Sequence, residues 1–148
     1  MKTGTPKELT VWLENQDPEK VFTVEEHVPL RSLDQNRLYW KIVTMIADAL
    51  HMSKPEVHNR LMQDHGRDLD LDIEGPIGKW IEDTAEMEEK ILRRADIHMR
   101  PTAKVRDGKR LWIMLKASHD MDKKEMNVLI DGAIQEAEQL NIYLEGIT

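Results

Sequence analysis

The spacing of apolar residues predicts two consecutive helices in the middle of the chain. The first helix follows Ser32-Leu33-Asp34-Gln35, a capping box in which the serine hydroxyl accepts from a first-turn amide, and runs to about Leu50. Its apolar residues surround most of the helix axis, which predicts a central and largely covered helix. Ser53-Lys54-Pro55-Glu56 repeats the start signal, and the second helix runs to about His65 and stops at Gly66.

Two further helices are predicted toward the C-terminus. Between about Asp83 and Arg94 the apolar residues return with helical spacing. Asp122 with Glu125 then caps a longer helix whose apolar residues keep the i, i+3, i+4, i+7 spacing: Met126, Leu129, Ile130, Ala133, Ile134, Ala137 and Leu140. This stripe indicates a core face, or a core face that also forms a dimer interface.

Short β-branched and alternating runs predict strands. Leu9 to Leu13 and Val21 to Val28 flank the turn residues Asn15-Gln16-Asp17-Pro18, which predicts an N-terminal β-hairpin. Asp68 to Glu74 alternates strictly between acidic and apolar residues, as an extended segment with two different faces does, and Gly75-Pro76 ends it. Lys104 to Leu115 predicts a second hairpin, because Asp107-Gly108 supplies the positive φ angles of a type I′ turn.

The order of these elements predicts an α+β fold in a single domain spanning residues 1–148. It has an N-terminal β-hairpin, central helices, a second, basic β-hairpin and a long C-terminal helix, without regular βαβ alternation. The absence of cysteine excludes disulfides, thiolate zinc sites and a cysteine nucleophile, and fits the cytosol. We expect neither a signal peptide nor a membrane partner, because no apolar run is long enough.

Charge is divided unevenly along the chain. The whole sequence carries −7, yet residues 90–116 hold nine basic and two acidic side chains, a net charge of +7. Such asymmetry suggests a local surface for a polyanion on an acidic body. The alternative is that these cations are simply solvated or pair with the acidic segments, since surface charge is common.

The basic hairpin orders its cations in a way that suits a phosphate backbone. Residues alternate between faces along a strand, so Lys104 and Arg106 share one side, and Lys109 and Arg110 follow the turn. A positive ribbon of this kind can follow phosphates without reading sequence. We expect these four residues to contribute most of the electrostatic affinity for a nucleic acid.

A second group of polar residues lies at the start of the first central helix. Free amides and the helix dipole attract phosphate oxygens there, and Tyr39 or Trp40 could stack on an unpaired base. The candidate binding residues of this segment are Arg31, Gln35, Asn36, Arg37, Tyr39 and Lys41. The structural alternative is that Gln35 completes the cap, Asn36 bonds a neighbouring loop and both aromatics fill the core.

The same segment carries a family resemblance. Residues 31–41 read RSLDQNRLYWK, which resembles the signature of the phage NinB family of recombination proteins, also called Orf, with a close match to about Ala47. The resemblance implies a homodimer that binds single-stranded DNA in a cleft, assists strand loading, works beside single-stranded DNA-binding protein and catalyses nothing. It also implies the host-cell cytosol if the chain is encoded by a phage or prophage.

No cofactor or metal ion is expected. Asp68, Asp70, Asp72 and Glu74 would share one face, but alternate residues of a strand lie about 6.6 Å apart, too far to hold one Mg²⁺ or Ca²⁺ easily. His58 and His65 are about two turns apart on one helix, beyond the single-turn spacing of a helical zinc site. There is no P-loop, glycine-rich dinucleotide turn or nucleophile elbow.

The leading hypothesis is therefore a non-catalytic recombination mediator that binds single-stranded DNA. It requires that the cations of the basic hairpin and those beside the helix start form one contiguous track. The alternatives are a metal-dependent nuclease acting on recombination intermediates, which would use the acidic ladder, and an adaptor that contacts only proteins.

Overall fold

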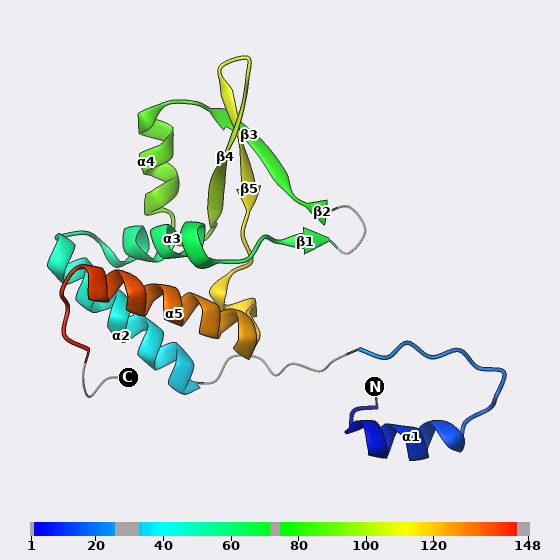
Figure 1. Cartoon of the computed structure of the whole chain (residues 1–148). Coiled ribbons are helices and arrows are strands. Elements are labelled where there is room, and N and C mark those ends of the chain that lie inside the picture. Colours follow the sequence, from blue (N-terminus) through cyan, green and yellow to red (C-terminus); the bar gives the residue numbers. More distant parts are fainter. Residues whose placement is uncertain (1, 26–32, 72–74, 145–148) are drawn as a thin grey trace.

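The chain folds as an α+β protein with a helical layer and a small antiparallel sheet (Figure 1). A computed structural model describes residues 2–25, 33–71 and 75–144. The helices are α1 (Pro6–Glu14), α2 (Leu33–Leu50), α3 (Lys54–His65), α4 (Ala85–Arg93) and α5 (Lys123–Gln139), with a 3-10 turn at Ser118–Asp120. The strands are β1 (Asp70–Leu71), β2 (Gly75–Pro76), β3 (Gly78–Glu82), β4 (Met99–Arg106) and β5 (Lys109–Met114).

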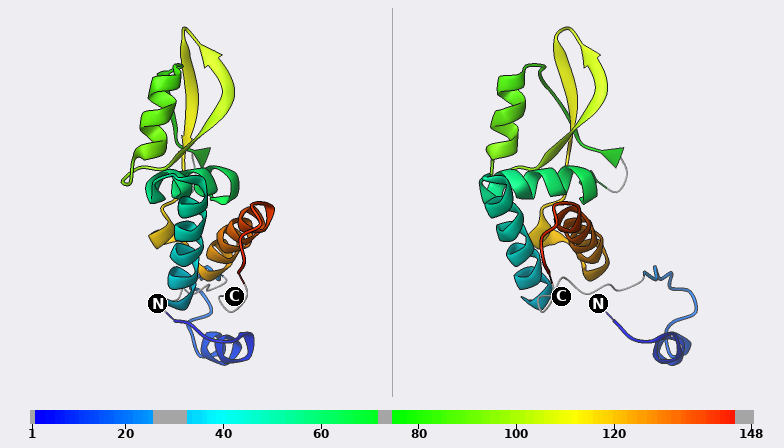
Figure 2. Two further views of the ribbon diagram at one scale, coloured as in Figure 1. Left: turned by 90° about the vertical axis from the view of Figure 1, so that its left-hand side faces the viewer. Right: turned by 60° about the vertical axis from the view of Figure 1, so that its left-hand side comes forward.

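Helices α2, α3 and α5 pack together around the larger part of the core (Figure 2). The apolar stripe of α5 faces α2 and α3, so its prediction as a core face is confirmed. Each fully buried aliphatic side chain contributes about 1.5–3 kcal/mol relative to exposure, which makes this layer the main source of stability. Its most deeply buried residues are Tyr39, Ile42, Val43, Ile46, Leu61, Met62, Met121, Met126 and Leu129.

The sheet has the strand order β3-β5-β4 and is antiparallel throughout. Helix α4 covers one of its faces, where Ile91 packs against Ile81, Met99 and Trp112 in a second, smaller core (Figures 1 and 2). Among the described residues no helix covers the opposite face in these views. The sheet therefore has a packed face and an open face.

Helix α3 joins the two parts through one buried side chain. The Asn59 amide nitrogen donates to the carbonyl oxygens of Leu92 (2.6 Å) and Arg94 (2.7 Å) at the C-terminal end of α4. Both amide protons are then used, so the Asn59 oxygen accepts, and His98 Nδ1 donates to it at 2.5 Å. These bonds satisfy carbonyls that the end of a helix leaves unpaired, and they fix α4 and β4 on the helical layer.

The predicted N-terminal β-hairpin is wrong. Residues 6–14 form α1, because the Thr5 hydroxyl accepts from the Glu8 amide and Pro6 occupies the first turn. Leu9, Trp12 and Leu13 have helical spacing, which outweighs the β-branched content of the run. Residues 21–25 are neither helix nor strand, and the end of the expected second strand lies outside the described residues.

The other predicted elements are largely confirmed. Ser53 caps α3 and Gly66 ends it, α4 lies within the expected segment, and Asp122 with Glu125 forms a complete capping box before α5. Helix α2 runs to Leu50 as expected, although the cap at Ser32 lies outside the described residues. Within the described part of the alternating segment, Asp70–Leu71 form β1, and β1 pairs with β2 at Gly75–Pro76, where the segment was expected to end.

Candidate nucleic-acid interface

The β4–β5 hairpin has the predicted turn at its tip. Asp107 and Gly108 both have positive φ angles, of 52° and 75°, as a type I′ turn requires. Arg106 and Lys109 flank the turn and lie directly opposite each other. Lys109 also lies opposite Glu82 of β3, which offsets part of its charge. The directly opposed like charges of Arg106 and Lys109 still cost stability, and an anionic ligand would reduce that cost.

The strand register places three cations on the open face of the sheet. Ile81, Trp112 and Met99 lie on the face that α4 covers. Side chains alternate along a strand, so Arg106 and Lys109 lie on the other face. Lys104 precedes Arg106 by two residues and shares that face. All three side chains are exposed.

A tryptophan lies on the same open face. Trp80 of β3 pairs with Leu111 of β5, two positions along the strand from Lys109. Its side chain is 41% exposed, whereas Trp112 on the packed face is buried. Sequence reasoning missed Trp80 because it did not predict β3. The signal available was the β-branched and aromatic content of Ile77-Gly78-Lys79-Trp80-Ile81 after Gly75-Pro76.

The six cations of residues 90–116 other than Lys104, Arg106 and Lys109 are all paired with carboxylates. The pairs are Lys90 with Glu86, Arg93 with Glu89 and Glu56, Arg94 with Asp96, Arg100 with Asp68, Arg110 with Asp83, and Lys116 with Glu125. Within the described part of the chain, Lys104, Arg106 and Lys109 form no salt bridge. Six of the nine cations therefore pair with acidic residues, as the alternative to a polyanion surface predicted. The basic surface is confined to the end of the hairpin.

Arg110 differs from the other three predicted hairpin residues. Its guanidinium donates from Nε to Asp83 Oδ1 (2.9 Å) and from Nη1 to the carbonyl of Thr102 (2.8 Å). It lies on the packed face of the sheet, opposite to Lys109, and is half-buried. Arg110 thus joins β5 to β4 and to the segment before α4, and its charge is paired with Asp83 within the fold.

Three of the α2 residues considered for binding, Gln35, Tyr39 and Trp40, are engaged in packing. Gln35 Nε2 donates to the Asn127 side chain (2.7 Å) and to the Lys123 carbonyl (3.2 Å), which joins α2 to α5. Tyr39 is fully buried, and its hydroxyl lies 2.6 Å from His58 Nδ1, so its ring offers no face to a base. Trp40 is half-buried and packs against the helical core, where its ring lies 4.8 Å from that of His58.

The other four candidate residues of this segment are not engaged in this packing or lie outside the described residues. Arg37 and Lys41 are exposed, one turn apart on α2. Asn36 is half-buried, and its side-chain oxygen has no hydrogen-bond partner among the described residues. Arg31 lies outside the described residues. Arg37 and Lys41 are thus the two α2 candidates whose charges face solvent.

The expected contiguous track of cations is not formed. The start of α2 and the tip of the β4–β5 hairpin lie at opposite ends of the folded body, with α3 between them (Figures 1 and 2). The sequence could not show this, because it does not define how the sheet is placed on the helices. The hairpin and the α2 residues are two separate surfaces, and only the hairpin combines cations with an exposed aromatic ring.

The first carboxylate of the acidic ladder, that of Asp68, is engaged within the fold. Asp68 accepts two hydrogen bonds of 2.8 Å from the guanidinium of Arg100, which lowers the pKa of that carboxyl. Residues 72–74 lie outside the described part of the chain. Asp68 therefore forms a structural ion pair with Arg100, which joins the segment before β1 to β4.

Comparisons with known proteins add no further constraint. A scan against protein-family models finds no match, and neither the curated proteins nor the solved structures contain a match. Of the helices in the described residues, none has the length and apolar character to cross a membrane.

Proposed function

We propose that this protein binds single-stranded nucleic acid on the open face of its β3-β5-β4 sheet. Lys104, Arg106 and Lys109 would neutralise phosphates, and Trp80 would stack on an unpaired base. Binding without sequence preference needs these two components, a cationic path for the backbone and an aromatic surface for the bases. A duplex offers no unstacked base to Trp80, so the arrangement favours a single strand.

One observation carries the proposal: the exposed Trp80 lies on the same face as the three cations that form no salt bridge with a described residue. The other six cations of residues 90–116 pair with carboxylates, so the cations of this segment that form no salt bridge with a described residue all belong to the hairpin. The opposed Arg106 and Lys109 repel each other, and a bound phosphate would relieve that repulsion.

The biological role in the proposal comes from the RSLDQNRLYWK segment. Its resemblance to the phage NinB family supports a recombination mediator that assists strand loading, acts as a homodimer and works beside single-stranded DNA-binding protein. We include no catalytic step. The nuclease alternative depended on the acidic ladder, and Asp68, its first carboxylate, is held by Arg100. Incubation of single-stranded DNA with the protein and Mg²⁺ should leave the strand intact.

The proposal is tested by equilibrium binding of a fluorescently labelled oligonucleotide, single-stranded or annealed to its complement, measured by anisotropy at low salt. Trp80→Ala should weaken single-strand binding by about 1–3 kcal/mol, or roughly 5- to 150-fold, because one stacked base is lost. Trp80→Phe keeps a ring and should retain most of the affinity. Duplex binding, which rests on phosphates alone, should change little with either substitution.

Two further variants make this measurement specific. Trp12→Ala removes a partly exposed tryptophan from α1, outside the sheet, and should leave binding unchanged. Arg37→Ala with Lys41→Ala removes the exposed cations of α2 and should have a smaller effect than Trp80→Ala. Equal binding of Trp80→Ala and the unmodified protein would overturn the proposed face. Absence of any oligonucleotide binding at low salt would favour the protein-only adaptor.

A further inference from the structure

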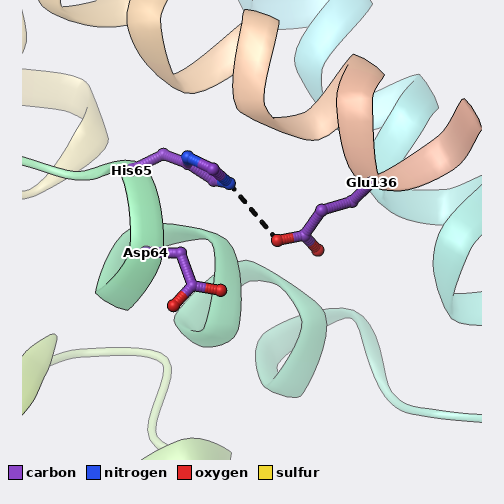
Figure 3. A group of neighbouring side chains, drawn as sticks. All are labelled: Asp64, His65 and Glu136. Atoms are coloured by element: carbon purple, nitrogen blue, oxygen red, sulfur yellow. Dashed lines mark hydrogen bonds and ion pairs between the residues drawn. The ribbon is translucent and has the colours of Figure 1, made fainter. Parts of the chain in front are cut away.

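The end of α3 and the middle of α5 bring together three potential metal ligands. His65 Nε2 lies 3.3 Å from Glu136 Oε1, and a ligand atom of Asp64 completes a group whose atoms all lie within 4.8 Å of one another (Figure 3). Asp64 and His65 belong to α3 and Glu136 to α5, so tertiary packing forms the group. His65 and Glu136 are half-buried, while Asp64 is exposed and accessible to an ion from solvent.

The imidazole of His65 is positioned by the absence of a side chain at Gly132. A Cβ added to Gly132 would lie 2.2–2.6 Å from three atoms of the His65 ring. Gly132 is buried on α5, one turn before Glu136, so the ring lies flat against the backbone of that turn. This packing limits the motion of the imidazole and directs Nε2 toward the Glu136 carboxylate (Figure 3).

The spacing of the group suits a transition-metal ion. Ligand atoms about 2.0–2.1 Å from a tetrahedral Zn²⁺ lie about 3.3 Å from one another. The His65–Glu136 distance of 3.3 Å already has this value, and a ligand atom of Asp64 lies within 4.8 Å of both, so the Asp64 side chain would have to move closer to complete a third position. One imidazole with two carboxylates favours Zn²⁺ over Mg²⁺, which prefers oxygen ligands and keeps its waters.

We propose that Asp64, His65 and Glu136 form a Zn²⁺-binding site with one position open to water or an external ligand. Because the ligands come from two helices, the ion would fasten the C-terminal end of α3 to α5. This site is separate from the sheet face proposed to bind nucleic acid, and its occupancy requires no nucleic acid. The sequence analysis did not favour zinc because His58 and His65 are two turns apart, and it could not bring in Glu136, which is remote along the chain.

Isothermal titration calorimetry of the full chain with Zn²⁺, after removal of metals by a chelator, tests the site. The unmodified protein should bind one ion per chain, and Mg²⁺ at the same concentrations should give no binding heat. His65→Gln, Glu136→Gln and Asp64→Asn should each weaken Zn²⁺ binding by more than about tenfold. Substitutions of residues that only support a metal ligand already cost about that much, and these three residues are the proposed ligands themselves. Zn²⁺ should also raise the melting temperature of the unmodified protein and not that of His65→Gln.

Matched controls separate this site from other surface groups. Glu138→Gln alters an exposed carboxylate two residues from Glu136. His119→Ala removes another exposed imidazole, whose Nε2 lies 3.4 Å from a carboxylate oxygen of Asp120. Both variants should bind Zn²⁺ like the unmodified protein. The proposal is overturned if the unmodified protein binds no stoichiometric Zn²⁺, if the three site variants keep its affinity, or if His119→Ala alone abolishes binding.

Discussion

Replacement of Asn59 by alanine should destabilise the protein strongly. The Asn59 side chain is 3% exposed and makes three hydrogen bonds, two to carbonyls at the end of α4 and one from His98. Each bond contributes about 1 kcal/mol net, and alanine would leave the part-buried carbonyls of Leu92 and Arg94 and the buried His98 without Asn59 as a partner. The sum predicts a loss of about 2–4 kcal/mol in the free energy of unfolding.

Urea denaturation near neutral pH, followed by far-UV circular dichroism, measures this loss. Asn59→Leu is a useful second variant because it fills the space of Asn59 and makes none of its bonds. If hydrogen bonding dominates, leucine should destabilise about as much as alanine. As a control, Gln135→Ala changes an exposed amide on α5 and should stay within about 0.5 kcal/mol of the unmodified protein.

Two results would refute this reasoning. A loss below about 1 kcal/mol for Asn59→Ala would mean that the carbonyls of α4 find other partners at little cost. Recovery of most of the stability by Asn59→Leu would mean that filling the space matters more than the bonds. In either case Asn59 would not be the residue that fixes the sheet on the helical layer.

Three other substitutions or conditions have defined outcomes. Burial lowers the pKa of His98 below 6.5, so the folded chain binds a proton at this imidazole less tightly than the unfolded chain does. The resulting stability is present above pH 6.5 and is lost as the pH falls through the lowered pKa. Melting temperatures measured across this pH range should show the loss, and His98→Asn should make the pH dependence smaller. Gly132→Ala should cost about 1–3 kcal/mol in urea denaturation, because its Cβ overlaps the His65 ring, whereas in a His65→Ala background the same change should be neutral or stabilising. Gly108→Ala should lower stability by about 1 kcal/mol, because Gly108 has a φ of 75°, and amide exchange should show faster opening of the β4–β5 tip.

The sequence predicted elements best where local chemistry determines them. The Asp122 and Glu125 capping box, the Ser53 cap of α3 and the Asp107-Gly108 turn are each encoded within a few residues, and all three are present. Thr5-Pro6 carries the same kind of signal, but the N-terminal hairpin was predicted from the β-branched and aromatic residues that follow, without that cap, and was incorrect. There the local cap was the better guide.

The candidate site was only partly predictable because it depends on tertiary pairing. The hairpin cations could be identified from the sequence, but which of them stay free depends on carboxylates elsewhere in the chain, such as Asp83 for Arg110 and Asp68 for Arg100. Trp80 joins the surface only because β3 pairs with β5. Long-range pairs of this kind leave no periodic signal in the sequence.

The salt dependence of single-strand binding tests the central claim most directly. Each phosphate that a cation neutralises contributes about 0.7 to the slope of log affinity against log salt concentration, so three contacts should contribute about 2. Simultaneous replacement of Lys104, Arg106 and Lys109 by alanine should therefore flatten that slope by about 2. A matched variant with Lys20, Lys54 and Arg60 replaced, all exposed and outside the sheet, should keep the original slope. Parallel lines for the hairpin variant and the unmodified protein would contradict the account.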